Sequence, residues 1–466
     1  MFLRNSCSDF AKEKIRCLRK YLKSCLRMKT MKDLLILVLT FANAINSEHF
    51  SSFKQLENLI DLNGHIVKAL KQYISNEQNT IGNLDISPEL FEMKSLKNKS
   101  KEQYAGNPIN QFFIIKQLLE ARKILERYPN IIQYSDIGDM NGRLPSQEDY
   151  AGVIEGIFRL QDTYNWEPRF FHQNTSEYKS EEPTADDYFE IGMYAFKIED
   201  YYHALPWFLE AHAKLRNNSN VSLSTHTLLD YLSYTTYKQG NFGHARNLTI
   251  ELLQIDPENT RFNENMKFFN ETIEAIKNGT PLESWQMTKQ SAFEAEHFIL
   301  NQRADDDFYE KRKYEALCRG DLLENDANRL SKLMCRYRHN HKPYLLLNPV
   351  KEEEMFDSPR IVMYHDILND REIEVLKRLA EPHLERALIH NPRTSALEPA
   401  QYRISKLCWL SESDHPVVKR VSKLIENLMN ITTRSAEMLQ IQNYGVGGHY
   451  EPHFDFSRVC TAFHKH

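Results

Sequence analysis

The residues best suited to chemistry lie near the end of the sequence, in the segment N-Y-G-V-G-G-H-Y-E-P-H-F-D-F at positions 443–456. A glycine-rich turn there leads into a stretch typical of a strand, whose alternation places His453 and Asp455 on the same face. An imidazole and a carboxylate side by side are two of the three ligands in the 2-His-1-carboxylate set that holds non-haem Fe(II). The H-x-D spacing is a weak signal by itself, and the glycine loop before it strengthens it modestly.

The elements around this segment predict a mixed α/β or β-rich domain. After residue 340, residues 360–368, 400–410 and 438–444 have the pattern of strands, and residues 369–380 have the pattern of a capped helix. These strands must carry the glycine loop and the H-x-D pair that follows it.

Residues 184–257 have the spacing of tetratricopeptide repeats, which stack into a concave surface that commonly binds extended peptide. The matching positions are Tyr188, Ile191, Gly192, Ala204, Phe208 and Ala211, and then Leu229, Leu232, Ala245, Leu252 and Pro257. Tyr231, Tyr234 and Tyr237 lie on the second repeat. Their rings either form platforms for proline in a polyproline II segment or simply fill the helix interface.

The first part of the chain is predicted to be helical. Apolar residues recur at helical spacing between Phe53 and Ile74. This pattern indicates either an apolar stripe that faces the core or a surface that pairs with a second copy of the chain. The periodicity favours the core-facing stripe. Further helices are predicted from Pro108 to Tyr128 and after Ser146, whose hydroxyl and Asp149 resemble a capping box.

The N-terminus has the pattern of a secretory signal. Residues 31–44 contain Lys32, an apolar run and Ala42-Asn43-Ala44, an A-x-A cleavage site. The basic residues 1–30 are either an upstream start chosen in error or a genuine long leader, so the true start is Met1 or Met31. The apolar run is shorter than the about 20 residues that a transmembrane helix needs, and the mature chain is expected to have no membrane span.

The cysteines that follow the signal fit an oxidising compartment. Cys318 and Cys335 are spaced to close a loop that a disulfide would stabilise by about 3 kcal/mol, whereas the pattern for zinc is weak. A glycoprotein is also expected, because N-x-S/T acceptors occur at Asn98, Asn174, Asn217, Asn220, Asn247, Asn270, Asn278 and Asn430.

Composition excludes several classes of protein. The 466 residues are 41% hydrophobic and carry only 15 glycines, which excludes a disordered or collagen-like chain. The net charge is −5 although residues 1–44 are basic, so the remainder is more acidic still. A net-acidic body without a dense basic stripe argues against nucleic acid as a partner.

Taken together, these motifs make the chain resemble the alpha subunit of collagen prolyl 4-hydroxylase from about residue 48 to 458. The matching motifs, in order, are G-N-P-I-N, R-L-Q-D-T-Y-N, D-Y-Y-H, L-D-Y-L-S-Y, Y-E-A-L-C-R-G, M-C-R-Y, H-D-I-L-N-D, A-Q-Y-R-I-S-K and the 443–456 segment.

The resemblance implies a multidomain fold, α and then α+β. A helical dimerisation domain is expected at 45–170, a tetratricopeptide peptide-substrate-binding domain at 184–280, a linker with the disulfide at 281–345, and a double-stranded β-helix (jelly-roll) dioxygenase domain at 346–466. The implied activity is that of an oxidoreductase in the endoplasmic reticulum lumen: 4-hydroxylation of proline in X-Pro-Gly repeats of procollagen with Fe(II), 2-oxoglutarate, oxygen and ascorbate. The implied beta subunit is protein disulfide isomerase.

The resemblance also assigns site residues. His453 and Asp455 would be iron ligands, Tyr444 would hydrogen-bond the distal carboxylate of 2-oxoglutarate, and Tyr450 would lie near the substrate proline. The groove residues of the peptide domain fall on Asp230, Tyr231, Tyr234, Arg261, Asn265 and Phe268. Phe268 stands where the family has a tyrosine, so its ring is kept and the hydroxyl is lost.

The chain departs from the family pattern after Asp455. The family continues with strands that supply the distal histidine and the basic residue for 2-oxoglutarate, whereas eleven residues follow Asp455 here. His464 and His466 are poor substitutes, because a loop of about eight residues hardly reaches across a barrel. We therefore expect either an active hydroxylase subunit or, as the alternative, an inactive truncated subunit that binds proline-rich peptide and partner subunits.

Overall fold

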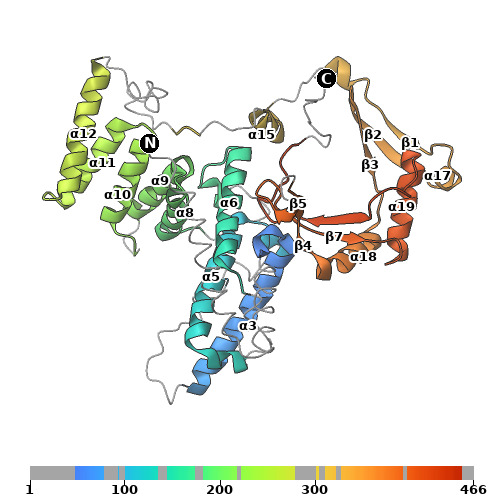
Figure 1. Cartoon of the computed structure of the whole chain (residues 1–466), viewed down its shortest axis with the longest axis horizontal. Helices are drawn as coiled ribbons and strands as arrows, with labels where there is room; N and C mark the ends of the chain where they lie inside the picture. The colour runs from blue at the N-terminus through green and yellow to red at the C-terminus, as the bar shows by residue number, and fades with distance from the viewer. Residues whose placement is uncertain are drawn as a thin grey trace, which may run out of the picture.

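The computed structural model describes residues 48–77, 93, 100–134, 144–173, 182–217, 222–278, 301–303, 310–321, 327–391 and 396–453. Helices make up its first two thirds, and small sheets with two longer helices make up the last third (Figure 1). The signal segment, the basic extension, Asp455 and the C-terminal tail lie outside the described residues.

Three long helices organise the N-terminal region: α3 (Phe53–Glu77), α5 (Pro108–Arg127) and α6 (Gln147–Tyr164). Asn107 caps α5 through its side chain, and Pro108 fits the first turn because it needs no amide partner there. The capping box predicted at Ser146 and Asp149 is confirmed, so α6 begins where the sequence indicates.

The apolar stripe of α3 faces the core of its own chain. Leu56, Ile66 and Leu70 are fully buried, and α3 packs against α5, the short helix α4 (Lys101–Ala105) and the 3-10 helix η4 (Pro129–Tyr134). The prediction of a core-facing stripe is confirmed. Self-association stays a prediction, and it would have to use another surface than this buried stripe.

Five helices form the tetratricopeptide-like region: α8 (Ala185–Lys197), α9 (Tyr201–Asn217), α10 (Thr225–Lys238), α11 (Phe242–Ile255) and α12 (Thr260–Lys277). Neighbouring helices pack as antiparallel pairs (Figure 1). Most of the predicted packing positions are confirmed as buried, and they are Tyr188, Ile191, Ala204, Phe208, Ala211, Leu229, Leu232, Ala245 and Leu252. Pro257 is exposed, so it does not pack in the helix interface. Gly192 is needed because a Cβ there would lie 2.7 Å from the Phe208 ring.

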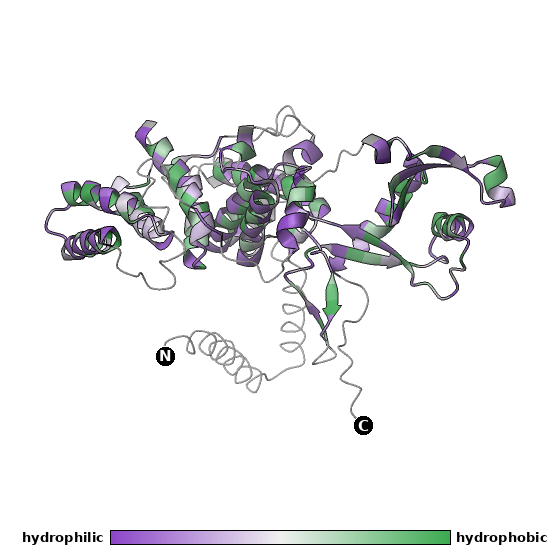
Figure 2. Cartoon of the chain, turned by 90° about the horizontal axis from the view of Figure 1, so that it is seen from above, coloured by the Kyte–Doolittle hydropathy of each residue, from purple (hydrophilic) through white to green (hydrophobic). Residues whose placement is uncertain are grey.

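One hydrophobic core runs through both helical regions. It extends from Leu56 on α3 to Leu232 on α10 without a break among the buried residues. Trp207 joins the two parts, because its ring lies 6.0 Å from Phe171 and 5.7 Å from Tyr188. The helices show one apolar and one polar side in Figure 2, as this shared core requires.

The strands form small antiparallel sheets. The first sheet has the order β1 (Cys335–Arg338), β2 (Val350–Asp357) and β3 (Arg360–His365), and the second β4 (Glu385–Arg386), β7 (Lys406–Leu410) and β8 (Leu439–Asn443). A two-stranded ribbon pairs β5 (Leu388–His390) with β6 (Leu397–Pro399). The strands predicted within 360–368, 400–410 and 438–444 are confirmed.

The described strands form small, separate antiparallel sheets, so the expected double-stranded β-helix stays a prediction. Two helices cover the sheets, α18 (Asp370–Ala380), capped by Asn369 as predicted, and α19 (Pro416–Met429). Strand β1 and helix α15 (Lys311–Arg319) lie within the segment expected as a linker, so that segment is partly folded.

The expected disulfide is not formed in the structure, where Cys318 and Cys335 are exposed free thiols. Cys318 lies on α15, which packs against α6, whereas Cys335 opens β1 in the first sheet. Their pairing therefore stays a prediction. Of the predicted glycosylation acceptors, Asn247, Asn270, Asn278 and Asn430 are exposed.

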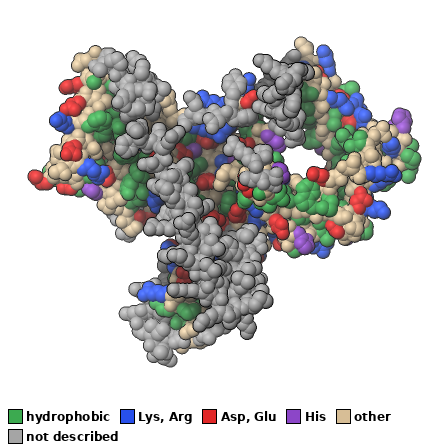
Figure 3. Space-filling view, viewed as in Figure 1, with side chains coloured by type: hydrophobic (Ala, Val, Ile, Leu, Met, Phe, Trp, Pro, Cys, Tyr) green, Lys and Arg blue, Asp and Glu red, His purple; other side chains and the backbone are tan. Residues whose placement is uncertain are grey.

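Charged side chains of both signs are spread over the described surface. On the face drawn in Figure 3, basic and acidic side chains are interspersed, and no continuous basic stripe is seen among the described residues. None of the helices in the described ranges combines the length and apolarity that a membrane crossing requires.

Candidate functional site

The glycine loop after β8 leads into an extended segment that runs beside residues 402–404. The amide of Ile404 donates to the carbonyl of His449 at 2.7 Å, and the amide of Glu451 donates to the carbonyl of Tyr402 at 2.9 Å. Arg403 and Tyr450 form an isolated antiparallel bridge. The segment before the H-x-D pair thus has strand-like pairing, as the sequence predicts.

His453 is exposed, and its orientation is defined by two contacts. Its Nδ1 lies 2.7 Å from the carbonyl oxygen of Glu451. Because a carbonyl only accepts, Nδ1 carries a proton, and in the neutral form of the ring the lone pair is then on Nε2. The ring also stacks on Tyr450 with centroids 4.1 Å apart, and the Arg403 guanidinium lies over the same tyrosine at 4.8 Å.

This tautomer fits a metal ligand, because a ligating histidine commonly donates its other ring N–H to a carbonyl. No group of three or more His, Cys, Asp or Glu side chains gathers for a metal within the described ranges, and Asp455 lies outside them. Tyr444 is 38% exposed and donates its hydroxyl to Gln442 Oε1 at 2.5 Å. The roles assigned to Tyr444, Tyr450, His453 and Asp455 remain predictions.

The N-terminal segment is hydrogen-bonded to the glycine loop. The amide of Gly445 donates to the carbonyl of Ser51 at 3.1 Å, and the amide of Phe53 donates to the carbonyl of Tyr444 at 3.3 Å. The Ser52 hydroxyl adds a bond of 2.7 Å to Asn443 Oδ1. Residues almost 400 positions apart in the chain are therefore joined through their backbones, which no side-chain pattern could have indicated.

Helix α6 also contacts the glycine loop, through Gly156 and Arg159. Gly447 has φ +75°, and a Cβ on it would lie 2.3 Å from the carbonyl oxygen of Gly156. Arg159 donates from Nε to the carbonyl of Gly447 at 2.7 Å, and burial lowers the pKa of Arg159 to about 10. Arg159 and Gly156 were not among the predicted site residues, although both lie on a helix that the sequence predicts.

Buried polar groups lie near the contact between the N-terminal segment and the glycine loop. Asp149 accepts from the amide of Phe50 at 3.2 Å, and burial raises its pKa to about 6. Lys406 donates to Gln55 Oε1 at 2.5 Å, and burial lowers its pKa to about 8. Burial, with Lys406 nearby, also lowers the pKa of His49 to about 4, so this imidazole is neutral at pH 7.

Most of the residues predicted for the peptide groove lie close together in the structure. Five of its six predicted residues line one cavity of about 240 Å³ between α10 and α12: Asp230, Tyr234, Arg261, Asn265 and Phe268. Arg261 binds Asp230 through two hydrogen bonds of 2.9 and 2.7 Å, which raises the pKa of Arg261. Ser233, Tyr237, Leu252 and Phe269 complete the lining.

The three tyrosines divide between the two roles that the sequence left open. Tyr231 contacts Phe189 and Phe196 at centroid distances of 5.8 and 5.0 Å, so it fills a helix interface. Tyr234 is 41% exposed and lies in the cavity lining together with Tyr237. Phe268, also 41% exposed, meets Tyr237 at 5.7 Å and 90°. The sixth predicted groove residue, Tyr231, lies outside the cavity lining.

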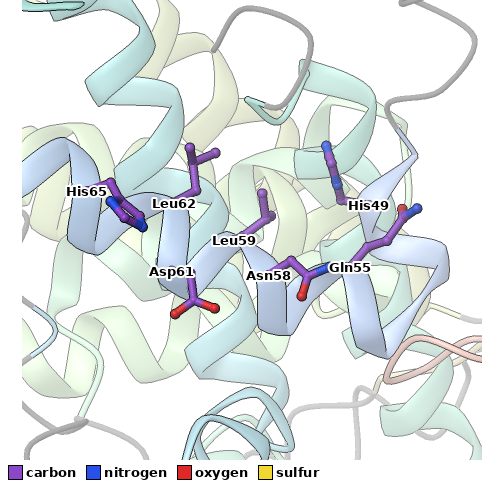
Figure 4. A pocket seen from close by; sticks show the side chains of 7 residues that line it. All are labelled: His49, Gln55, Asn58, Leu59, Asp61, Leu62 and His65. Carbon is purple, nitrogen blue, oxygen red and sulfur yellow. The ribbon is translucent and has the colours of Figure 1, made fainter. Parts of the chain in front are cut away.

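A further cavity of about 420 Å³ follows α3 and is lined by His49, Gln55, Asn58, Leu59, Asp61, Leu62 and His65. Figure 4 shows these side chains spread along the helix rather than converging on one point. Such an arrangement does not resemble a catalytic centre.

Comparison with known proteins gives the same assignment for both helical regions. Residues 52–177 match the family model of the prolyl 4-hydroxylase alpha-subunit N-terminal region, and residues 185–275 match that of the prolyl 4-hydroxylase peptide-substrate-binding domain.

Relatives extend the similarity beyond the helical regions. Prolyl 4-hydroxylase subunit alpha-1 of Rattus norvegicus is 37% identical over 421 residues, covering 88% of this chain and 77% of that protein. Subunit alpha-2 of Gallus gallus is 34% identical, covering 88% and 78%, and subunit alpha-2 of Caenorhabditis elegans is 32% identical, covering 91% and 78%. The chain therefore belongs to the family of prolyl 4-hydroxylase alpha subunits.

Proposed function

We propose that this chain is the alpha subunit of a procollagen-proline 4-dioxygenase, which hydroxylates proline in X-Pro-Gly repeats. The observation that carries the proposal is the groove on the tetratricopeptide-like region. Exposed Tyr234 and Phe268 offer aromatic faces to proline rings, and the Asp230–Arg261 pair and Asn265 offer polar groups to the peptide backbone. Neutral, proline-rich peptide is the ligand class that this combination suits.

The catalytic residues in this proposal are those of the glycine loop and the H-x-D pair. His453 and Asp455 would hold Fe(II), and the hydrogen bond between His453 Nδ1 and the Glu451 carbonyl keeps the histidine in the ligating tautomer. Tyr444 would bind the distal carboxylate of 2-oxoglutarate through its hydroxyl, and Tyr450 would support the substrate proline beside His453. Bound iron, 2-oxoglutarate and oxygen would supply the oxidising chemistry, and ascorbate, a reductant, would keep the iron as Fe(II). The residues of the protein would hold and orient these groups.

The same proposal includes partners and location. A lumenal chain with its signal at 31–44 would work in the endoplasmic reticulum together with protein disulfide isomerase as beta subunit, and with a second alpha subunit joined through the N-terminal region. Cys318 and Cys335 would form a disulfide in that oxidising compartment.

Decarboxylation of 2-oxoglutarate tests the proposal. The chain, co-expressed with protein disulfide isomerase, is given a Pro-Pro-Gly repeat peptide, and the peptide is analysed for 4-hydroxyproline. Turnover that His453→Ala abolishes is the expected result. His383→Ala is the matched control, because His383 is exposed on the 3-10 helix η5 (Glu381–His383) and should leave turnover unchanged.

Peptide binding is measured in parallel with the same peptide. Binding without turnover would reject the dioxygenase and identify a peptide-binding subunit instead. Absence of both peptide binding and turnover would refute the proposed function as a whole.

A further inference from the structure

A cavity of about 550 Å³ lies where three parts of the chain meet. Its walls come from α6, from α15 and from the turn between α8 and α9, and its floor is the segment Gly447–Pro452 of the glycine loop. We call it the interdomain cavity. The volume falls within the range of roughly 300–1,000 Å³ that ligand sites occupy.

Large apolar side chains from all three walls are exposed in the interdomain cavity. Tyr164 at the end of α6 is 39% exposed, Ile198 in the α8–α9 turn is 50% exposed, and Tyr314 on α15 is 41% exposed. Tyr164 is held in place by stacking on Trp166 with centroids 5.1 Å apart. Exposed apolar groups that converge from separate elements mark a binding site more often than scattered single ones do.

The floor of the cavity adjoins the catalytic residues. Tyr450 lies in the lining and stacks on His453. A chain that lies in the cavity would therefore pass directly beside the predicted iron ligand.

A line of aromatic rings leads from the peptide groove toward the interdomain cavity. Successive ring contacts lead from Phe268 to Tyr237, from Tyr237 to Tyr234 and from Tyr234 to Tyr201, with centroids 5.7, 6.0 and 6.0 Å apart. Tyr201 begins α9, three residues after Ile198 in the cavity lining. The aromatic line of the groove thus ends at the rim of the interdomain cavity.

Several charges of the cavity wall are paired, either with one another or with Arg303, which lies outside the lining. His203 lies between Asp200 and Asp162 at 2.6 and 3.1 Å. Glu315 accepts from Arg303 at 2.9 Å, and Arg303 also lies 3.3 Å from Asp162. A wall whose charges compensate one another favours an uncharged ligand over an ionic one.

We propose that the interdomain cavity is a second peptide subsite, which holds the uncharged proline-rich chain between the groove and the proline at His453. The proposal rests on the proposed function, because it takes the same substrate class. Binding at two linked subsites raises the effective concentration of one end when the other is bound. Long peptides should therefore gain affinity from the cavity, and short peptides should bind the groove alone.

The test compares a short Pro-Pro-Gly peptide of about nine residues with a long one of about thirty, both kept single-stranded, by fluorescence anisotropy on the full chain. The double variant Tyr164→Ala/Tyr314→Ala should weaken the long peptide about tenfold and leave the short peptide within about twofold. Tyr234→Ala should weaken both peptides. Tyr337→Ala is the matched control, because Tyr337 on β1 is 69% exposed and lies outside the cavity lining.

A crosslinking measurement tests the subsite independently of any packing that the double variant loses. A benzophenone amino acid in place of Tyr314 should crosslink to the long peptide, and the same group in place of Tyr337 should not. Equal affinity of the double variant and the wild type for the long peptide, with no crosslink at 314, would overturn the subsite while the groove still binds. If neither peptide binds the wild type, the proposed groove fails, and the subsite fails with it.

Discussion

The contact between the glycine loop and α6 can be tested at Gly447. Alanine there has two costs. A left-handed φ of +75° disfavours a side chain by about 1–2 kcal/mol. The new Cβ would also lie 2.3 Å from the carbonyl oxygen of Gly156, and relief of such overpacking costs about 1–3 kcal/mol more. Gly447→Ala should therefore lower the free energy of unfolding by about 2–5 kcal/mol.

Urea unfolding followed by tryptophan fluorescence measures this change, and hydrogen exchange of residues 443–453 shows where it acts. Gly64→Ala is the matched control, because a Cβ at Gly64 meets nothing within 4 Å and the residue lies within α3. Replacing an exposed helical glycine should raise the free energy of unfolding by about 1 kcal/mol. An unchanged urea midpoint for Gly447→Ala, with unchanged exchange in the loop, would refute the close approach of Gly447 and Gly156.

Three further predictions concern other parts of the structure. Burial alone would lower the pKa of His203, but hydrogen bonds to Asp162 and Asp200 outweigh it and raise the pKa from 6.5 to about 9. The stability that the charged His203 contributes is therefore complete below pH 6.5 and is lost as the pH rises through 9. The difference in unfolding free energy between wild type and His203→Gln should thus shrink by roughly 3 kcal/mol between those pH values, and a constant difference would contradict a charged His203. Phe268→Tyr should tighten Pro-Pro-Gly binding about two- to tenfold in titration calorimetry, because it adds a hydroxyl at the groove, and weaker or equal binding would exclude a hydrogen bond there. Ser52→Ala should lower the free energy of unfolding by about 1 kcal/mol and speed hydrogen exchange at Gly445, because it removes the hydrogen bond to Asn443. Unchanged exchange would argue against the contact between the N-terminal segment and the glycine loop.

Helical periodicity made much of the fold predictable. The small and large residues of the tetratricopeptide-like region repeat locally, so Ala204, Phe208 and Ala211 could be assigned to a helix interface from spacing alone. Caps such as Ser146 mark helix starts for the same local reason. The groove residues came from resemblance, and their shared cavity requires only that α10 and α12 pack as such repeats do.

Contacts between distant parts of the chain were not predictable. The bond from Gly445 to Ser51 joins two backbones, and any residue type offers the same amide and carbonyl. The sheets differ from expectation for a related reason, since a strand pattern shows that a strand forms and not which strand it pairs with. The exposed tyrosines at 164 and 314 also have no distinctive spacing, and only the structure brings them to one cavity.

Helix α6 contacts both the tetratricopeptide-like region and the glycine loop, and it therefore fixes their relative position. Its residues Gly156 and Arg159 hold the loop, while Phe158 stacks on His203 at 4.5 Å and Asp162 binds the same histidine of α9. The helix has 18 residues and is thus about 27 Å long, and one side of its middle, with Val153, Ile154 and Ile157, is buried in the shared core. We expect a helix anchored in this way to resist bending and so to pass a shift on the peptide side to the loop. For this reason we expect substitutions on α6 to change peptide binding and loop exchange together, whereas substitutions on α12 should change peptide binding alone.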